Sequence, residues 1–446
     1  MIPTMNNNIN NNNNNVIETE GDLWEPEPLV PDIDPDEYKF VLNPHVITSK
    51  PGKHIMIDGR ECLNAGTHNY LGLADSPRLE QVSLDTVRHY GVGSCGPRAF
   101  YGTMDVHLEL EEQLARFLNV QETVVYSFGF STVASAIPAY AKATDIIYYD
   151  EQCNFAIQRG IVASKSRAIK FKHNDADDLE RKIEHLAEEQ KRKYGKTKTI
   201  RTFLVVEGIY ANTGDICQLK QLNVVAKRHK IRLFIDESRS FGVLGSGGKG
   251  ITQHLNIDMN DVDLIMVALE NALCSFGGFC AGSSFVIDHQ RLAGSGYCFS
   301  ASLPPFQCRA AQESLMMIEE DPSIVEKAQE LFVYADRQLS KLTRLKNISD
   351  PLSPIKVLVK KAWFDSEIEK PTYVKRDAMW LEQICANILS EDRIAISMAR
   401  YLEDEEMSSP FAAIRLIVNA KMTFGDIDRI FSALERSSFE LRLSCL

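Results

Sequence analysis

Apolar runs of strand length alternate with amphipathic helical stretches between about residue 60 and residue 320. Stretches with helical periodicity include Asp175–Lys193 and Leu219–His229. The strand-like runs are Thr123–Tyr126, Asp145–Tyr149, Phe203–Glu207, Leu233–Asp236, Leu264–Ala268 and Gly278–Gly282. Strands that alternate with helices predict a mostly parallel sheet, and strands rich in Val and Ile predict helices on both faces of it. We therefore expect an α/β fold for this part of the chain.

The pattern changes near residue 320. A long helical segment, Pro322–Leu345, is followed by irregular and β-like pieces and by a final helix, predicted from about Phe424 to Glu440 with Thr423 as its cap. This change predicts a large domain over residues 61–320 and a smaller C-terminal α+β domain over residues 321–446.

Residues 1–60 are predicted to form a tail and an arm outside these domains. The run from Asn6 to Asn15 is nearly all Asn and cannot bury a core, which predicts disorder. Residues 18–38 are acidic and rich in proline, which indicates an extended arm. Trp24 and Leu29 in this arm are candidate anchors on the chain's own body or on a partner.

Bulk properties exclude several classes of protein. The net charge of -12 argues against a nucleic-acid-binding protein. The ten cysteines include no CxxC pair and the histidines no paired spacing, so neither a disulfide framework nor a metal site is expected. The sequence has no apolar run of about 18 residues and no secretory signal, so no transmembrane helix is predicted.

Asp236 ends a strand-like run at the point where parallel strands face a ligand crevice. A carboxylate in this position is able to pair with a protonated ring nitrogen, as pyridoxal phosphate (PLP) chemistry requires. A purely structural aspartate is the alternative. The Ser-x-Ser-x-Gly pattern that starts at Ser238 favours the ligand-binding interpretation.

Two further segments have a composition suited to close backbone approach. Tyr126–Thr132 precedes an apolar helix and suits phosphate binding at a helix N-terminus, with Ser131 or Thr132 as an ordinary N-cap in the alternative interpretation. A glycine-rich loop from Gly91 to Thr103 precedes a helix predicted at Asp105–Leu118. Its Cys95 has no Cys–His–Asp arrangement, so we expect a packed or interface residue rather than a nucleophile.

These motifs, in this order, resemble those of the α-oxoamine synthases, fold-type-I PLP enzymes that condense an amino acid with an acyl-CoA. The series runs from Asn69-Tyr70-Leu71-Gly72 through Phe171–Asp175, Val206–Tyr210 and Asp236–Gly242 to Arg415-x-x-x-x-Ala420-x-x-Thr423. The resemblance implies a PLP-transferase fold with a mostly parallel sheet and a smaller C-terminal α+β domain. Several segments are most similar to the non-catalytic first long-chain-base subunits of serine palmitoyltransferase: Trp24–Pro31, Cys95–Thr103, Ser275–Cys280, Ser284–Leu292 and Gly296–Pro305.

The chain departs from the family pattern where the cofactor is held. The family's Schiff-base lysine falls on Cys274, and a thiol cannot form the imine. Glu270 lies where its charge would repel a phosphate. The ring-stacking histidine, the phosphate-binding hydroxyls and two further histidines of the family fall on Asn154, Asn271, Leu273, Arg239 and Met422. Asp236 and Arg415 are retained family positions, yet no catalytic residue is expected in this chain.

The resemblance implies a heterodimer with a catalytic long-chain-base subunit 2, which binds PLP covalently. Such a complex condenses L-serine with palmitoyl-CoA to 3-oxosphinganine in sphingolipid biosynthesis, and small regulatory subunits are possible additions. Active sites of this family lie at the subunit interface, so Cys95, Arg98 and Tyr101 are the candidate residues facing the partner's site. Arg98 contacts substrate or cofactor, or else forms a structural ion pair.

Members of this subunit class carry an amino-terminal membrane helix, and the Asn-rich and acidic stretches stand in its place here. We therefore expect attachment to the cytosolic face of the endoplasmic reticulum membrane through partners, or else a missing upstream segment.

Two other functions are compatible with the sequence. One is a regulatory or adaptor pseudoenzyme with no direct role in catalysis. The other is an independent enzyme with Cys95 or Cys274 as nucleophile, although the sequence offers no base beside either cysteine.

Overall fold

The computed structural model describes residues 27–30, 43–195, 200–364, 375–402, 405–408 and 411–440. Ile47–Leu446 belong to one compact unit and Met1–Val46 to another. The Asn-rich tract and most of the acidic arm lie outside the described residues. The domain boundaries at residues 60 and 320 remain predictions.

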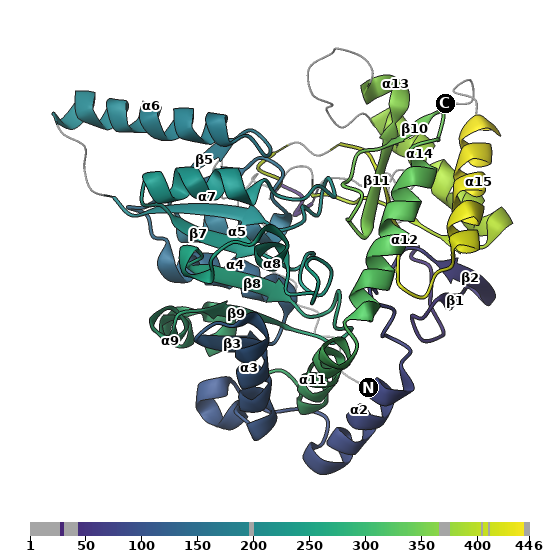
Figure 1. The fold of residues 1–446 in the computed structure, drawn as a ribbon, viewed down its shortest axis with the longest axis horizontal. Helices are drawn as coiled ribbons and strands as arrows, with labels where there is room; N and C mark the ends of the chain where they lie inside the picture. Colours follow the sequence, from purple (N-terminus) through teal and green to yellow (C-terminus); the bar gives the residue numbers. More distant parts are fainter. Residues whose placement is uncertain are drawn as a thin grey trace, which may run out of the picture. The chain divides into compact units, whose positions relative to one another are not determined.

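A seven-stranded sheet forms the centre of the larger unit, in the order β3-β9-β8-β7-β6-β4-β5 (Figure 1). Strands β4 to β8 pair in parallel, and β9 runs antiparallel to both β3 and β8. The strands are β3 (Glu122–Tyr126), β4 (Ile146–Asp150), β5 (Arg167–Phe171), β6 (Thr202–Glu207), β7 (Arg232–Asp236), β8 (Leu264–Ala268) and β9 (Gly278–Gly282). The predicted mostly parallel α/β sheet is confirmed.

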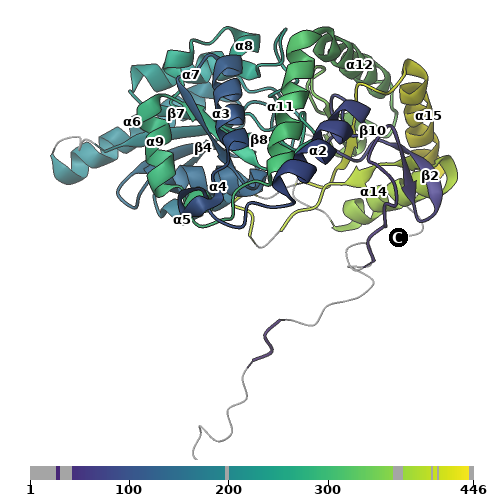
Figure 2. The same ribbon diagram turned by 90° about the horizontal axis from the view of Figure 1, so that it is seen from below.

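Helices cover both faces of this sheet, so its central strands are buried on both sides. Figure 2 shows α3 (Asp105–Leu118) and α7 (Leu219–Arg228) on one face, with α4 (Gly129–Tyr140) and α5 (Phe155–Ser164) on the other. Every residue of β4, β8 and β9 is buried. Further helices are α2 (Pro77–Tyr90), α6 (Ala176–Tyr194), α8 (Ile251–Leu255), α9 (Ser284–Ala293), α10 (Ser295–Cys298) and α11 (Pro305–Glu320).

Two smaller sheets complete the unit. One is antiparallel in the order β10-β11-β14-β13, from β10 (Leu345–Asn347), β11 (Ile355–Lys360), β13 (Ser397–Met398) and β14 (Ile414–Ile417). The other joins β1 (His54–Ile57), β2 (Arg60–Asn64) and β12 (Ile394–Ala395). The helices of this region are α12 (Ser323–Leu339), α13 (Lys361–Phe364), α14 (Lys375–Asn387) and α15 (Phe424–Glu440).

The C-terminal helices show one success and one error of sequence reasoning. Thr423 caps α15, because its hydroxyl accepts a hydrogen bond from the Asp426 N–H at 3.2 Å, as predicted. The helix predicted to extend to Leu345 ends at Leu339 instead. Beyond that point Thr343 bonds to the Glu435 carboxylate on α15, which draws the chain out of the helical path. None of the described helices is both long and apolar enough to cross a membrane.

Candidate functional site

A pocket of about 230 Å³ opens at the carboxyl ends of β7 and β8. The first residues of α4 and α5, the loop after β8, and residues of the C-terminal region form its walls. The structure brings together six residues that the sequence had named from separate segments: Asn154, Asp236, Arg239, Glu270, Asn271 and Arg415. Leu273 and Met422 are buried and, like Cys274, are not part of the pocket lining.

Asp236 is held by contacts within the chain. The side chain is 2% exposed, and its two oxygens accept hydrogen bonds from Asn154 Nδ2 at 2.8 Å and from the Ser238 N–H at 2.9 Å. Asn154 is at the same time the N-cap of α5, because its Oδ1 accepts from the Ile157 N–H at 3.1 Å. The side chain at the ring-stacking position of the family therefore lines the pocket with both of its polar atoms hydrogen-bonded within the chain.

Glu207 lies beside this pair at the end of β6. Its carboxylate accepts the backbone N–H groups of Asn154 and Ala211 at 2.8 and 3.1 Å. Burial, reinforced by the charge of Asp236, raises the pKa of Glu207 to about 8. Sequence reasoning used Glu207 only as part of a family motif, and a carboxylate at the end of a parallel strand was the signal that could have marked it.

Arg239 crosses the pocket toward the loop that follows β8. Its Nη1 donates to Asn271 Oδ1 at 2.8 Å and to the Tyr70 hydroxyl at 3.4 Å. Asn271 Nδ2 in turn donates to the Ser238 carbonyl at 2.7 Å. His68 contacts the same Tyr70 hydroxyl at 2.8 Å, and burial, with the nearby positive charges, lowers the pKa of His68 well below its ordinary value. The guanidinium is thus engaged by groups of this chain.

Glu270 lies against the start of α4. A Cβ built on Gly129, the first residue of that helix, would be 2.5 Å from Oε1 and 2.6 Å from Oε2 of Glu270. The N-cap position is occupied by Phe128, which makes no side-chain capping bond. The predicted N-caps Ser131 and Thr132 are wrong, since both lie inside the helix and Thr132 Oγ1 donates back to the Phe128 carbonyl at 2.8 Å.

Cys274, at the family's lysine position, does not line the pocket. Its Sγ donates to Asn69 Oδ1 at 2.9 Å, and its backbone has a φ of 50°. Burial raises the pKa of the thiol to about 12. A thiol of this kind is protonated at neutral pH, which argues against a cysteine nucleophile at this position.

Arg98 of the glycine-rich loop forms an ion pair inside the chain. Its Nη1 and Nη2 donate to the two Glu111 carboxylate oxygens at 2.7 and 3.0 Å, and its Nε donates to Thr103 Oγ1 at 3.0 Å. Glu111 also accepts from the Val125 N–H at 2.8 Å. Arg98 was expected either to contact substrate or cofactor or to form a structural ion pair, and the structure contains the ion pair.

The rest of this loop is hydrogen-bonded to another segment of the chain, and two of its side chains are exposed. Cys95 and Tyr101 are both exposed and have positive φ values of 58° and 64°. The Ser302 N–H and hydroxyl donate to the Gly96 carbonyl at 2.9 and 3.0 Å, and the same hydroxyl contacts the Gly102 carbonyl. The loop is therefore tied to the segment before α11 while the ring of Tyr101 is left uncovered.

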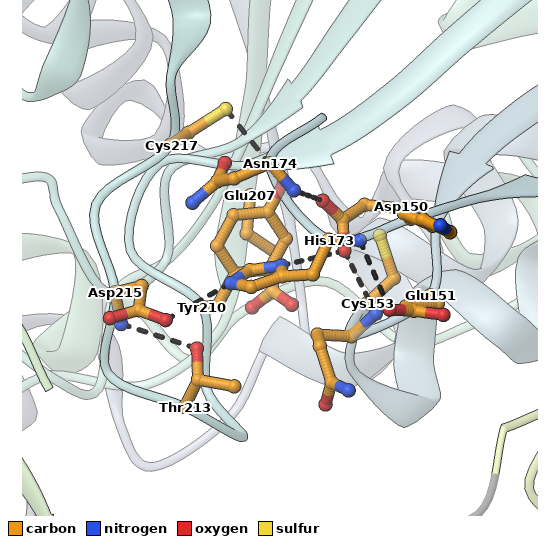
Figure 3. A network of polar contacts seen from close by, with 12 residues as sticks. Asp150, Glu151, Cys153, His173, Asn174, Glu207, Tyr210, Thr213, Asp215 and Cys217 are labelled. Atoms are coloured by element: carbon orange, nitrogen blue, oxygen red, sulfur yellow. Dashed lines mark hydrogen bonds and ion pairs between the residues drawn. The ribbon is translucent and has the colours of Figure 1, made fainter. Parts of the chain in front are cut away.

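Figure 3 shows a network of polar contacts between His173, which follows β5, and Asp150, at the end of β4. The His173 ring contacts Asp150 Oδ1 at 2.8 Å through Nδ1 and Asp215 Oδ2 at 3.1 Å through Nε2, and it lies edge-on to Tyr210 at 4.6 Å. Asp150 also accepts the Gln152 N–H at 2.9 Å. This network fixes the turn that leads into α5. Histidine spacing gave no hint of it, and the motif Phe171–Asp175 was the available signal.

Comparison with known proteins assigns the chain to a family. The family described as Aminotransferase class I and II matches residues 60–433. Long chain base biosynthesis protein 1b of Oryza sativa subsp. japonica is 39% identical over 93% of this chain and 83% of that protein. Serine palmitoyltransferase 1 of Dictyostelium discoideum is 38% identical over 94% of this chain and 86% of that protein. The chain belongs to the serine palmitoyltransferase 1 branch of this family.

A solved structure supports the fold. Serine palmitoyltransferase from S. paucimobilis, with a bound PLP–myriocin aldimine, matches with a TM-score of 0.78 at 21% identity, over 92% of this chain and 97% of that chain. At this identity the likeness concerns the fold alone, and the predicted PLP-transferase fold is confirmed.

PLP is the cofactor in the solved neighbours, and the pocket of this chain does not fit it. The lysine position holds a thiol that is bonded to Asn69. Both oxygens of the Asp236 carboxylate already accept hydrogen bonds within the chain, from Asn154 Nδ2 and from the Ser238 N–H. A carboxylate lies where the N-terminus of α4 would receive a phosphate. No catalytic step is therefore assigned to this pocket.

Proposed function

We propose that this chain is the non-catalytic subunit of a serine C-palmitoyltransferase, which condenses L-serine with palmitoyl-CoA to 3-oxosphinganine in the first step of sphingolipid biosynthesis. The catalytic lysine and its covalently bound PLP belong to a partner, a long-chain-base subunit 2. One observation carries the proposal: the chain is similar to serine palmitoyltransferase 1 over 94% of its length, yet has Cys274 at the lysine position.

The contribution of this chain is to shape the partner's site from across the interface. The geometry of the glycine-rich loop supports this role, because Phe100 and Tyr101 are exposed aromatic side chains on a backbone that is already fixed. Exposed aromatic groups are enriched at the centres of protein interfaces. Phe128 and Phe276, which stack edge-to-face at 5.5 Å and are also exposed, add further apolar surface.

Co-expression tests the proposal. The full chain and a lysine-bearing homologue are produced separately and together, and formation of 3-oxosphinganine from labelled serine is measured. Activity is expected only from the pair. Tyr101→Ala is expected to lower activity or pair formation, whereas Val224→Ala, at an exposed position on α7, is a matched control that leaves both unchanged. A lysine-bearing chain that is fully active without this one would favour the adaptor function instead.

The proposal includes attachment to the cytosolic face of the endoplasmic reticulum membrane through partner subunits. Cell fractionation with and without the lysine-bearing chain tests this part separately. Membrane association that persists when no partner is present would contradict attachment through partners.

A further inference from the structure

The pocket differs from a cofactor site that has merely lost its lysine. Two groups that a phosphorylated pyridine ring would use, and the residue at the lysine position, are each engaged or covered by side chains of this chain. Asp236 is bonded to Asn154, the start of α4 is covered by Glu270, and Cys274 is bonded to Asn69. Loss of the lysine alone would leave the first two free.

The contact between Glu270 and α4 has a simple electrostatic basis. The first N–H groups of a helix have no partner within the helix, and the helix dipole makes that end positive. Phe128 supplies no side-chain cap there, and the two Glu270 oxygens lie over Gly129. A carboxylate in this position stabilises the helix as a bound anion would.

A phosphate group cannot share this position. Two negative groups a few ångströms apart repel each other strongly in a partly desolvated pocket. Asn154 adds a second obstacle, because a ring nitrogen that approached Asp236 would have to displace a hydrogen bond of 2.8 Å. The Asn154 side chain cannot turn away without also giving up the N-cap bond to the Ile157 N–H.

We infer that Glu270 takes the place of a ligand phosphate at the N-terminus of α4, so that the pocket rejects phosphorylated ring compounds such as PLP even without a covalent bond. The inference goes beyond the proposed function and does not depend on it, because it concerns only the ligands that this pocket admits. If the pocket rejects PLP, the chain contributes no bound PLP to any assembly that it joins.

The probe is 4′-deoxypyridoxine 5′-phosphate, which resembles PLP but has no aldehyde and therefore forms no imine with surface lysines. Its unphosphorylated form, 4′-deoxypyridoxine, reports binding of the ring alone. Both are titrated into the purified full chain by equilibrium dialysis. In the unaltered chain the phosphate group is expected to give no gain in affinity.

Glu270→Gln removes the charge and keeps the shape of the side chain. We expect the phosphorylated probe to bind this variant at least about tenfold more tightly, which corresponds to about 1.4 kcal/mol, with the ring-only probe unchanged. Inorganic phosphate is expected to compete for the new site. The matched control is Glu406→Gln, which removes a charge from the same pocket but not from the start of α4.

Each outcome is decisive. An unaltered chain that prefers the phosphorylated probe overturns the inference, as does a Glu270→Gln chain that gains no affinity for it. Equal gains in both variants would show a general charge effect and would also overturn it. Because no assay of acyl transfer enters the experiment, its failure is distinct from a failure of the proposed function.

Discussion

Removing the Arg98 guanidinium alone is expected to destabilise the chain more than removing its whole ion pair with Glu111. Only 4% and 8% of the two side chains are exposed, so the pair is desolvated. In Arg98→Met, the Glu111 carboxylate loses two hydrogen bonds and retains the bond from the Val125 N–H. A buried charge without a counter-charge then has to be accommodated in the folded state.

Breaking one side of a buried ion pair typically costs about 3–5 kcal/mol, whereas apolar replacement of both partners is often close to neutral. We therefore expect Arg98→Met to lower the free energy of unfolding by about 3–5 kcal/mol, and Arg98→Met with Glu111→Leu to lower it by less than the single change. Urea unfolding followed by circular dichroism, with comparison of m-values, measures both. A single variant that loses under about 1 kcal/mol, or a double variant less stable than the single one, would refute this reasoning.

Three further predictions concern other parts of the chain. Burial opposes a charge on His173, yet the hydrogen bonds that its ring donates to two aspartates outweigh the burial and raise its pKa to about 9. This pKa lies above the unfolded value of about 6.5, so the free energy that the His173 charge adds to folding is fully present below about pH 6.5 and is lost as the pH rises through about 9. Urea midpoints of unfolding measured across this pH range should fall accordingly. In His173→Gln the midpoints should depend less on pH. Gly102→Ala should lower the melting temperature because its Cβ would meet backbone carbonyls of the same loop, whereas Gly93→Ala, with open space around it, should not. Iodoacetamide should label exposed Cys95 much faster than Cys274, which is partly buried and has a raised pKa. Mass spectrometry of the peptides measures both rates, and equal rates would contradict this reasoning.

The fold was largely predictable because the central strands are buried on both faces. The predicted bounds of β8 and β9 match the structure residue for residue, and both are fully buried apolar runs. Strand β5 was missed because it lies at the edge of the sheet, where Arg167 and Lys170 are exposed and interrupt the apolar pattern. Periodicity reports burial, so β3 at the opposite edge, where four of five residues are buried, was recognised, whereas β5, where only Phe171 is buried, was not.

The sequence predicted which residues lie in the candidate site, but it did not predict the hydrogen bonds and ion pairs that they form. The family pattern indicated that Asn154, Asp236 and Arg239 would gather in one pocket, and they do. The hydrogen bond between Asn154 and Asp236, like the ion pair between Arg98 and Glu111, joins groups whose approach is set by the packing of separate elements. Sequence spacing carries no information on which polar partner a side chain chooses once the fold has formed.

The hydrogen bonds that hold the glycine-rich loop with Tyr101 have a consequence for the affinity of a complex formed at this surface. A segment that becomes ordered only on binding loses conformational entropy at that moment, which weakens the complex. Here the hydrogen bonds of Ser302 to the Gly96 carbonyl hold the loop backbone within the single chain. The entropy cost of ordering this loop is therefore part of the folding of the single chain. A protein that binds here would contact a loop whose backbone is already ordered.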